Sequence, residues 1–255
     1  MTDTAETDRL RARYLDLIED VIINRIYRDP PQQTKRWKRL VFGEERRAIG
    51  RDLPSQAHSM IGQARMRNLR HCLETAIRTG VPGDFIETGV WRGGACIYAR
   101  AILEAYGAKE RTVWVADSFA GLPPPDAEKY PSDSGDKHHK NAALAISRAD
   151  VEAHFELYGL LDDRVQFLEG WFKDTLPTAP IEQLAVLRLD GDMYESTMDA
   201  LRALYQKVSP GGFVIVDDFG AVPACAQAVR DYLGKRGEVV DFSEIDWTGV
   251  YWRKV

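Results

Sequence analysis

The chain has 255 residues, 44% of them hydrophobic, and a formal net charge of -5 at pH 7. This composition supports one large α/β domain or two small ones, and the acidic balance argues against nucleic-acid binding as the main function. The N-terminal residues lack the basic and apolar regions of a signal peptide, and no apolar run approaches the roughly 20 residues of a membrane span, so we expect a cytoplasmic protein that does not bind membranes.

The N-terminal third is predicted to form two helices separated by an irregular stretch. Apolar residues recur at helical spacing over residues 7–28, which predicts an amphipathic helix that ends at Asp29-Pro30-Pro31. Residues 29–54 show no clear period, and a second helix is expected over 59–79. We therefore expect an N-terminal helical extension and cap over residues 1–80, followed by a larger domain over 81–255.

Strands and helices alternate from residue 84 onward, which is typical of a doubly wound, mostly parallel α/β sheet. The expected order is strand 84–90, helix 93–106, strand 111–118, helix 148–158, strand 164–169, strand 183–190, helix 194–207, strand 211–218 and helix 222–235. Two further strands, 239–245 and 249–253, are expected to pair antiparallel at the sheet edge.

One segment of this domain lies outside the alternation. Residues 122–145, called here the lid segment, show no periodicity, and a connection of that length is usually a lid or disordered. The three cysteines lie in helical contexts without metal-ligand spacing, so we expect reduced, packed thiols at Cys72, Cys96 and Cys225.

A glycine-rich turn follows the first strand of the larger domain. Gly89 and Gly93 allow the backbone to approach a ligand near a helix N-terminus, but the spacing departs from the nicotinamide fingerprint. Glu87 precedes the turn and would repel a pyrophosphate, whereas it suits the ammonium group of S-adenosylmethionine. Asp117 ends the second strand, where an acid can accept hydrogen bonds from ribose hydroxyls. The simpler alternative is that the glycines only permit tight packing of strand on helix.

Aromatic residues end the third strand, where they provide a further candidate contact. Trp171 and Phe172 follow Gly170 and present a surface on which an adenine ring could pack. Trp171 is equally compatible with an ordinary core position.

Carboxylates follow two strands that the pattern places side by side. Asp190 ends strand 183–190 and Asp192 follows it, and Asp217 and Asp218 come at the end of strand 211–218. Burying such charges is unfavourable unless a cation compensates them, and oxygen ligands suit Mg²⁺ or Mn²⁺. We expect Asp190, Asp217 and Asp218 to bind the metal and Asp192 to act as general base. The alternative is helix capping and turn formation, and we expect one of the four to cap a helix.

The lid segment carries two adjacent histidines. His138 and His139 could hydrogen-bond a substrate when the segment closes, although solvated loop histidines are the default expectation.

Several sequence motifs, spread over nearly the whole chain, strongly resemble those of the macrocin-type sugar O-methyltransferases of natural-product biosynthesis. The motifs are residues 54–62 (PSQAHSMIG), 83–95 (GDFIETGVWRGGA), 114–119 (WVADSF), 170–175 (GWFKDT), 189–192 (LDGD) and 216–218 (VDD). The resemblance implies a class I methyltransferase fold, Rossmann-like, with residues 81–255 as the methyltransferase domain. It also implies S-adenosylmethionine and Mg²⁺ as cofactors, with the metal and base roles given above.

The resemblance further implies an acceptor and a set of contacts. The acceptor would be a 6-deoxyhexose on a natural-product aglycone, and the N-terminal helices would form a homo-oligomer. A small catechol or phenol, or less favourably a nicotinamide-dependent sugar oxidation, remains the alternative, as does a non-enzymatic scaffold. Candidate cofactor contacts are Met60, Glu87, Thr88, Gly89, Gly93, Asp117, Ser118, Gly170, Trp171, Phe172 and Asp190, and candidate substrate contacts are His138, His139 and Tyr194.

Overall fold

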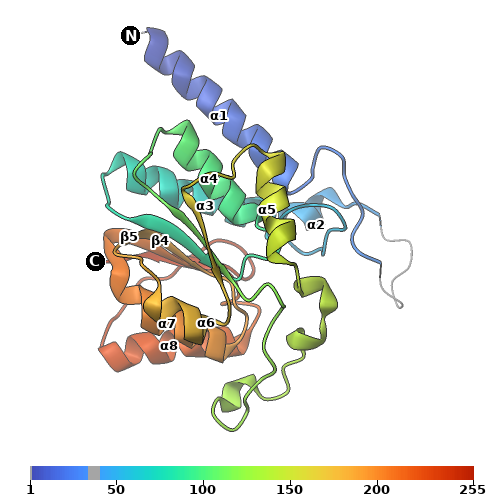
Figure 1. The fold of residues 1–255 in the computed structure, drawn as a ribbon, viewed down its shortest axis with the longest axis vertical. Helices are drawn as coiled ribbons and strands as arrows, with labels where there is room; N and C mark the ends of the chain where they lie inside the picture. Colours follow the sequence, from blue (N-terminus) through green and yellow to red (C-terminus); the bar gives the residue numbers. More distant parts are fainter. Residues whose placement is uncertain (1, 34–40) are drawn as a thin grey trace.

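The computed structural model describes residues 2–33 and 41–255, and a seven-stranded sheet forms its centre (Figure 1). The strand order is β3-β2-β1-β4-β5-β7-β6. The strands β1 (Asp84–Thr88), β2 (Val113–Asp117), β3 (Val165–Glu169), β4 (Leu184–Leu189) and β5 (Val208–Val216) pair in parallel. At the edge, β7 (Val250–Arg253) pairs antiparallel with both β5 and β6 (Ser243–Glu244). The expected doubly wound sheet with an antiparallel C-terminal edge is confirmed.

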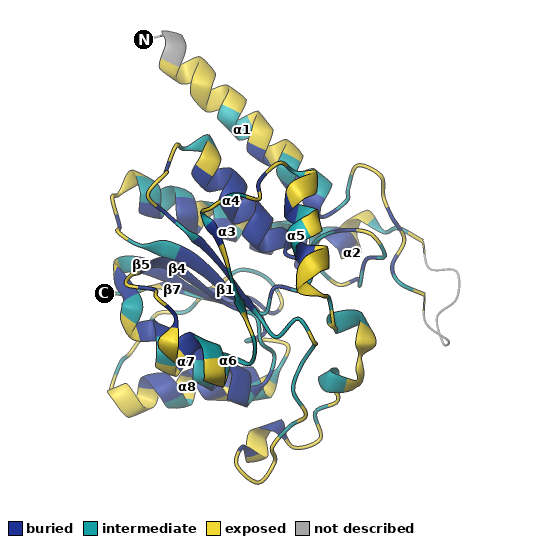
Figure 2. Ribbon diagram, in the orientation of Figure 1, coloured by how far each residue is buried: buried dark blue, intermediate teal, exposed yellow. Residues whose placement is uncertain are grey.

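Helices cover both faces of the sheet (Figure 1). One face packs against α3 (Gly62–Arg78), α4 (Gly94–Ala105) and α5 (Arg148–Leu157), and the other against α6 (Phe172–Thr175), α7 (Tyr194–Leu204) and α8 (Pro223–Arg236). Successive strand residues alternate between these two layers, as the pleat requires: Phe85 belongs to the first core and Ile86 to the second. Buried residues fill both layers, whereas α1 and the lid segment are largely exposed (Figure 2).

The N-terminal helix α1 (Thr2–Ile22) extends away from the body of the molecule, and only its C-terminal part is packed (Figure 1). Leu15 and Ile22 are fully buried in the core shared with α3 and α4. The helix begins before the expected residue 7 and ends before 28, because the chain turns after Ile22 and Asn24 adopts a positive φ. A short helix, α2 (Glu44–Ala48), lies in the stretch expected to be irregular, and residues 34–40 of that stretch lie outside the described part.

Three other expectations about the elements differ from the structure. The strand expected over 239–245 is reduced to Ser243–Glu244, and Val239 is 99% exposed. Strand β5 begins at Val208, before the expected residue 211, because its start pairs with Leu184 of β4. Helix α6 was not expected, since four residues are too few to show a helical period.

The lid segment contains only short 3₁₀ turns, as its lack of periodicity predicted. The three cysteines are buried and unpaired, in agreement with the sequence. Within residues 2–33 and 41–255, no helix has the length and apolar content needed to cross a bilayer.

Candidate active site

One cavity of about 730 Å³ lies beyond the C-terminal ends of the parallel strands, in the size range of ligand sites. It is lined by the segment before α3, the loops after β1 to β5, the lid segment, the first turns of α7, and residues 247–248 before β7. Because the carboxyl ends of parallel strands meet at one sheet edge, motifs more than 100 residues apart share this space.

The turn after β1 is held by the carboxylate that ends β2. Asp117 Oδ2 accepts a hydrogen bond from the Val90 N–H at 2.7 Å, and its Oδ1 accepts one from the Phe119 N–H at 2.8 Å. Burial raises the pKa of Asp117, and these N–H groups partly offset the shift. Gly89 is required here, since it has φ +90° and a Cβ would collide with the Asp190 carbonyl. The approach of β1 to β4 therefore fixes the floor of the turn.

Glu87 lines the cavity and is 2% exposed. Its carboxylate pairs with the Arg188 guanidinium and accepts a hydrogen bond from the Cys96 thiol at 2.9 Å. Burial raises the pKa of Cys96, so this thiol remains protonated and donates. In the structure the positive partner of this carboxylate is Arg188. Binding of a cofactor ammonium group by Glu87 stays a prediction.

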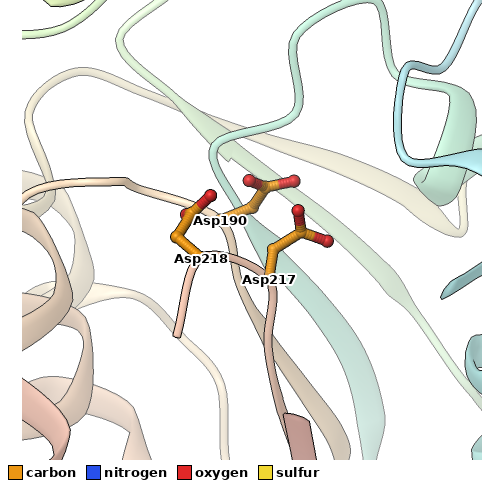
Figure 3. Close-up of side chains that lie close together, drawn as sticks. All are labelled: Asp190, Asp217 and Asp218. Carbon is orange, nitrogen blue, oxygen red and sulfur yellow. The ribbon is translucent and has the colours of Figure 1, made fainter. Parts of the chain in front are cut away.

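Three carboxylates converge at the ends of β4 and β5 (Figure 3). Ligand oxygens from Asp190, Asp217 and Asp218 lie within 4.8 Å of one another. Asp190 follows the last residue of β4, and the other two follow β5, its parallel neighbour in the sheet. The structure therefore confirms that these strand ends bring the three carboxylates together.

Two buried arginines compensate part of the negative charge. Arg188, in β4, pairs with Asp190 at 2.6 Å and also with Glu87 and Asp217. Arg65, in α3, reaches the other oxygen of Asp217. The pleat explains this arrangement, because Glu87 and Arg188 are register partners and face the layer that contains α3.

The remaining charge fits a divalent cation. Asp218 is 9% exposed and has no guanidinium partner among the described residues, and one of its oxygens accepts a hydrogen bond from the Asp192 N–H at 3.0 Å. Burial first, and neighbouring carboxylates second, raise the pKa values of Asp190 and Asp218 well above the ordinary range. An all-carboxylate donor set that ionises with difficulty by itself is suited to a hard cation such as Mg²⁺. Asp190, Asp217 and Asp218 would hold that ion.

Asp192 lies between the acidic cluster and the lid segment. Its backbone has φ +58°, which is uncommon for a residue other than glycine. Burial raises the pKa of its carboxyl to about 6, and the charge of His138 acts in the opposite direction. A base with a pKa near 6 is ionised at neutral pH and can still accept a proton.

The lid segment is attached to the turn after β1 and extends toward the acidic cluster. The Trp91 indole N–H donates to the Ala143 carbonyl at 2.8 Å. His138 lines the cavity, and its Nδ1 lies 2.6 Å from an Asp136 carboxylate oxygen.

Most of the residues singled out from the sequence line this cavity, and four do not. Those that line it are Met60, Glu87, Gly89, Asp117, Ser118, His138, Gly170, Trp171, Phe172, Asp190, Asp192, Asp217 and Asp218. The other four are Thr88, Gly93, His139 and Tyr194. The Tyr194 hydroxyl instead donates to Asp231 of α8 at 2.9 Å. The expectation that one of the four aspartates caps a helix is wrong, because α7 and α8 receive no cap from them.

Sequence reasoning missed three residues that shape the site. Arg188 interrupts an otherwise apolar strand, and a buried charge at that position was a signal that acidic partners lie close by. Arg65 lies in α3, and nothing in its local sequence indicates a contact with Asp217, 152 residues away. Asp133 of the lid segment contacts α7, and its local sequence resembles an ordinary turn.

Comparisons with known proteins agree with this geometry. Residues 11–254 match the profile of a family described as Macrocin-O-methyltransferase (TylF). The chain is 52% identical over 244 residues to a mycinamicin III 3''-O-methyltransferase of Micromonospora griseorubida, covering 94% of this chain and 96% of that one. It is 53% identical over 252 residues to an 8-demethyl-8-(2,3-dimethoxy-alpha-L-rhamnosyl)-tetracenomycin-C 4'-O-methyltransferase of Streptomyces olivaceus, covering 97% and 94%.

Solved structures show the same fold. The O-methyltransferase NovP superposes with a TM-score of 0.91 at 50% identity, over 96% of this chain and 99% of that one. The calicheamicin methyltransferase CalS11 superposes with a TM-score of 0.61 at 20% identity, over 75% and 79%, which supports the fold alone.

Proposed function

Since the chain belongs to the macrocin O-methyltransferase family, we propose that it methylates a hydroxyl of a 6-deoxyhexose carried by a natural-product aglycone. Relatives that share half of its residues are named for methylation of a mycinamicin and of a rhamnosyl-tetracenomycin. The methyl donor is S-adenosylmethionine, as the class I fold implies.

The observation that carries this proposal is the position of the acidic cluster. Asp190, Asp217 and Asp218 share one cavity with the turn after β1, so a donor at the turn and an acceptor at the cluster would face each other. We infer that Mg²⁺ is required, and that it supplies the lowered pKa and fixed orientation that a sugar hydroxyl needs.

The residues of the chain then have separate tasks. Asp117 would accept hydrogen bonds from the ribose while it keeps the turn closed through Val90 and Phe119. Asp192 would take the hydroxyl proton as the new C–O bond forms and the C–S bond of the sulfonium breaks, leaving a neutral thioether. Trp171 and Phe172 would pack against the adenine.

Metal removal tests the proposal directly. Enzyme treated with EDTA and freed of chelator should transfer no methyl group to a deoxysugar glycoside, and Mg²⁺ or Mn²⁺ should restore transfer. Asp218→Asn should weaken Mg²⁺ binding, measured by calorimetry, without loss of S-adenosylhomocysteine binding. Full turnover by demetallated enzyme would refute the metal requirement. Turnover of simple catechols with none of deoxysugar glycosides would refute the acceptor class.

We also propose that residues 1–80 act as a cap and as the contact between subunits. Met60 lines the cavity, so the cap contributes directly to the site. On α1, Leu10 and Leu17 are 54% and 55% exposed, on a helix that projects from the body (Figure 2). A second copy of the chain would cover them. Leu10→Lys with Leu17→Lys should lower the mass measured by light scattering, and an unchanged mass would refute this contact.

A further inference from the structure

A carboxylate of the lid segment caps the helix that follows the candidate base. Asp133 is 2% exposed, although its neighbours in the segment are exposed. Its Oδ1 accepts a hydrogen bond from the Tyr194 N–H at 2.7 Å, and its Oδ2 accepts one from the Glu195 N–H at 3.0 Å. These are the first two residues of α7, and the local N-cap residue, Met193, supplies no side-chain hydrogen bond. A residue 61 positions away thus does what a local Ser, Thr or Asp does in most helices.

The turn that this cap supports carries the candidate base in an unfavourable backbone conformation. Asp192 has φ +58°, and L-residues leave this region unless the surrounding structure holds them there. On one side, the Asp192 N–H donates to an Asp218 carboxylate oxygen at 3.0 Å. On the other side, Asp133 holds the N–H groups of Tyr194 and Glu195. The base therefore lies between two carboxylates: Asp218 binds its own N–H group, and Asp133 binds the N–H groups two and three residues further on.

The cap also fastens the lid segment at the acidic end of the cavity. Next to it, Tyr130 is 6% exposed and its ring lies 5.7 Å from the ring of Tyr194. The far end of the segment is fastened by the hydrogen bond from Trp91 to Ala143. Between these two attachments His138 lines the cavity. If the segment lifted, α7 would lose its only side-chain cap among the described residues, and the turn would lose the hydrogen bonds from Asp133.

We propose that Asp133 is a positioning residue that couples closure of the lid segment to the orientation of Asp192. This inference rests on the proposed function, because it assigns Asp133 a role in the reaction for which Asp192 is the base. The carboxylate does not line the cavity and acts through the backbone of α7. An enzyme with the segment closed over the acceptor would have its base in place, and an open one would not.

Three variants test this role. Asp133→Ala removes the cap, Asp133→Asn keeps one acceptor oxygen, and Ser134→Ala changes an exposed neighbour as a matched control. For Asp133→Ala we expect kcat to fall about tenfold and KM for the acceptor to rise, by analogy with the loss of a helix cap. KM for S-adenosylmethionine and the affinity for S-adenosylhomocysteine should stay within about twofold, as expected for a residue away from the cofactor turn. Asp133→Asn should recover part of kcat.

Hydrogen–deuterium exchange provides a readout that needs no acceptor. With S-adenosylhomocysteine bound, Asp133→Ala should accelerate exchange both in residues 122–145 and at the amides of 192–195, while exchange in α3 stays unchanged. A variant that exchanges faster only in 122–145, or that keeps the kcat and KM of the wild type, would overturn the coupling. If no deoxysugar is methylated by the wild type, the proposed function fails, while unchanged exchange at 192–195 would still overturn this inference separately.

Discussion

The two ends of the cavity neutralise their carboxylates by different means. At the end beside the turn after β1, Asp117 accepts hydrogen bonds from the main-chain N–H groups of Phe119, two residues away, and Val90, 27 residues away. At the acidic end, Asp217 depends on the side chains of Arg65 and Arg188, which are 152 and 29 residues away. The first carboxylate is therefore bound by the main chain of adjacent turns, and the second by side chains carried on β4 and α3. The residual charge at the second end is where a cation would bind.

The largest expected effect is on turnover, and it should arise at the acidic end of the cavity only. Asp192→Asn should lower kcat about a thousandfold, because an amide cannot accept the hydroxyl proton. Asp117→Asn should instead raise the dissociation constant for S-adenosylhomocysteine about tenfold, since hydrogen bonds to a charged group are lost. Steady-state kinetics and calorimetry on both variants measure the contrast. If Asp192→Asn keeps its turnover, the acidic end does not contain the base.

The next effect concerns stability. Arg188→Met should lower the free energy of unfolding by about 3–5 kcal/mol, because Glu87 and Asp217 remain buried with less compensation. Adding Glu87→Gln should recover part of the loss, since one uncompensated charge is then removed. Urea unfolding with and without Mg²⁺ measures both. A double variant no more stable than Arg188→Met alone would show that lost packing, not charge, dominates.

The smallest effect is a difference in pH dependence. Burial first, then the neighbouring His154 and Arg92, lower the pKa of His58 to about 4. As the pH falls from 6.5 toward 4, the unfolded chain binds a proton that the folded chain does not, so stability is lost in this window. When the pH is lowered from 7 to 5, the free energy of unfolding of His58→Gln should fall by about 1 kcal/mol less than that of the wild type, after allowance for solvent screening.

The acidic end should behave in the opposite way. Raised pKa values at Asp190 and Asp218 mean that the folded, metal-free chain binds protons first, which stabilises it as the pH falls. Denaturation of metal-free Asp218→Asn at pH 7 and 5 should therefore show a smaller stabilising contribution on acidification than the wild type. Equal pH dependence in the two proteins would contradict the uncompensated negative charge assigned to this end.

The same contrast explains how much of the molecule the sequence could predict. The alternation of strands and helices, the glycine turn and the acids after β4 and β5 depend on local patterns and on one topological rule, and all are present. Arg65 and Asp133 were missed because their roles depend on contacts between distant segments. The ends of α1 and the length of β6 were misplaced, since turns and edge pairing decide them, not apolar spacing.

A close backbone contact between the N-terminal segment and α4 limits how members of this family can be recombined. The Gly94 N–H at the start of α4 donates to the His58 carbonyl at 3.0 Å, and a Cβ on Gly94 would collide with that carbonyl. His58 N–H in turn donates to the Ile22 carbonyl at the end of α1. A chimera that joins the N-terminal segment of one family member to the sheet of another must therefore exchange both sides of this contact together. Removing the first sixty residues would also remove residues that line the cavity.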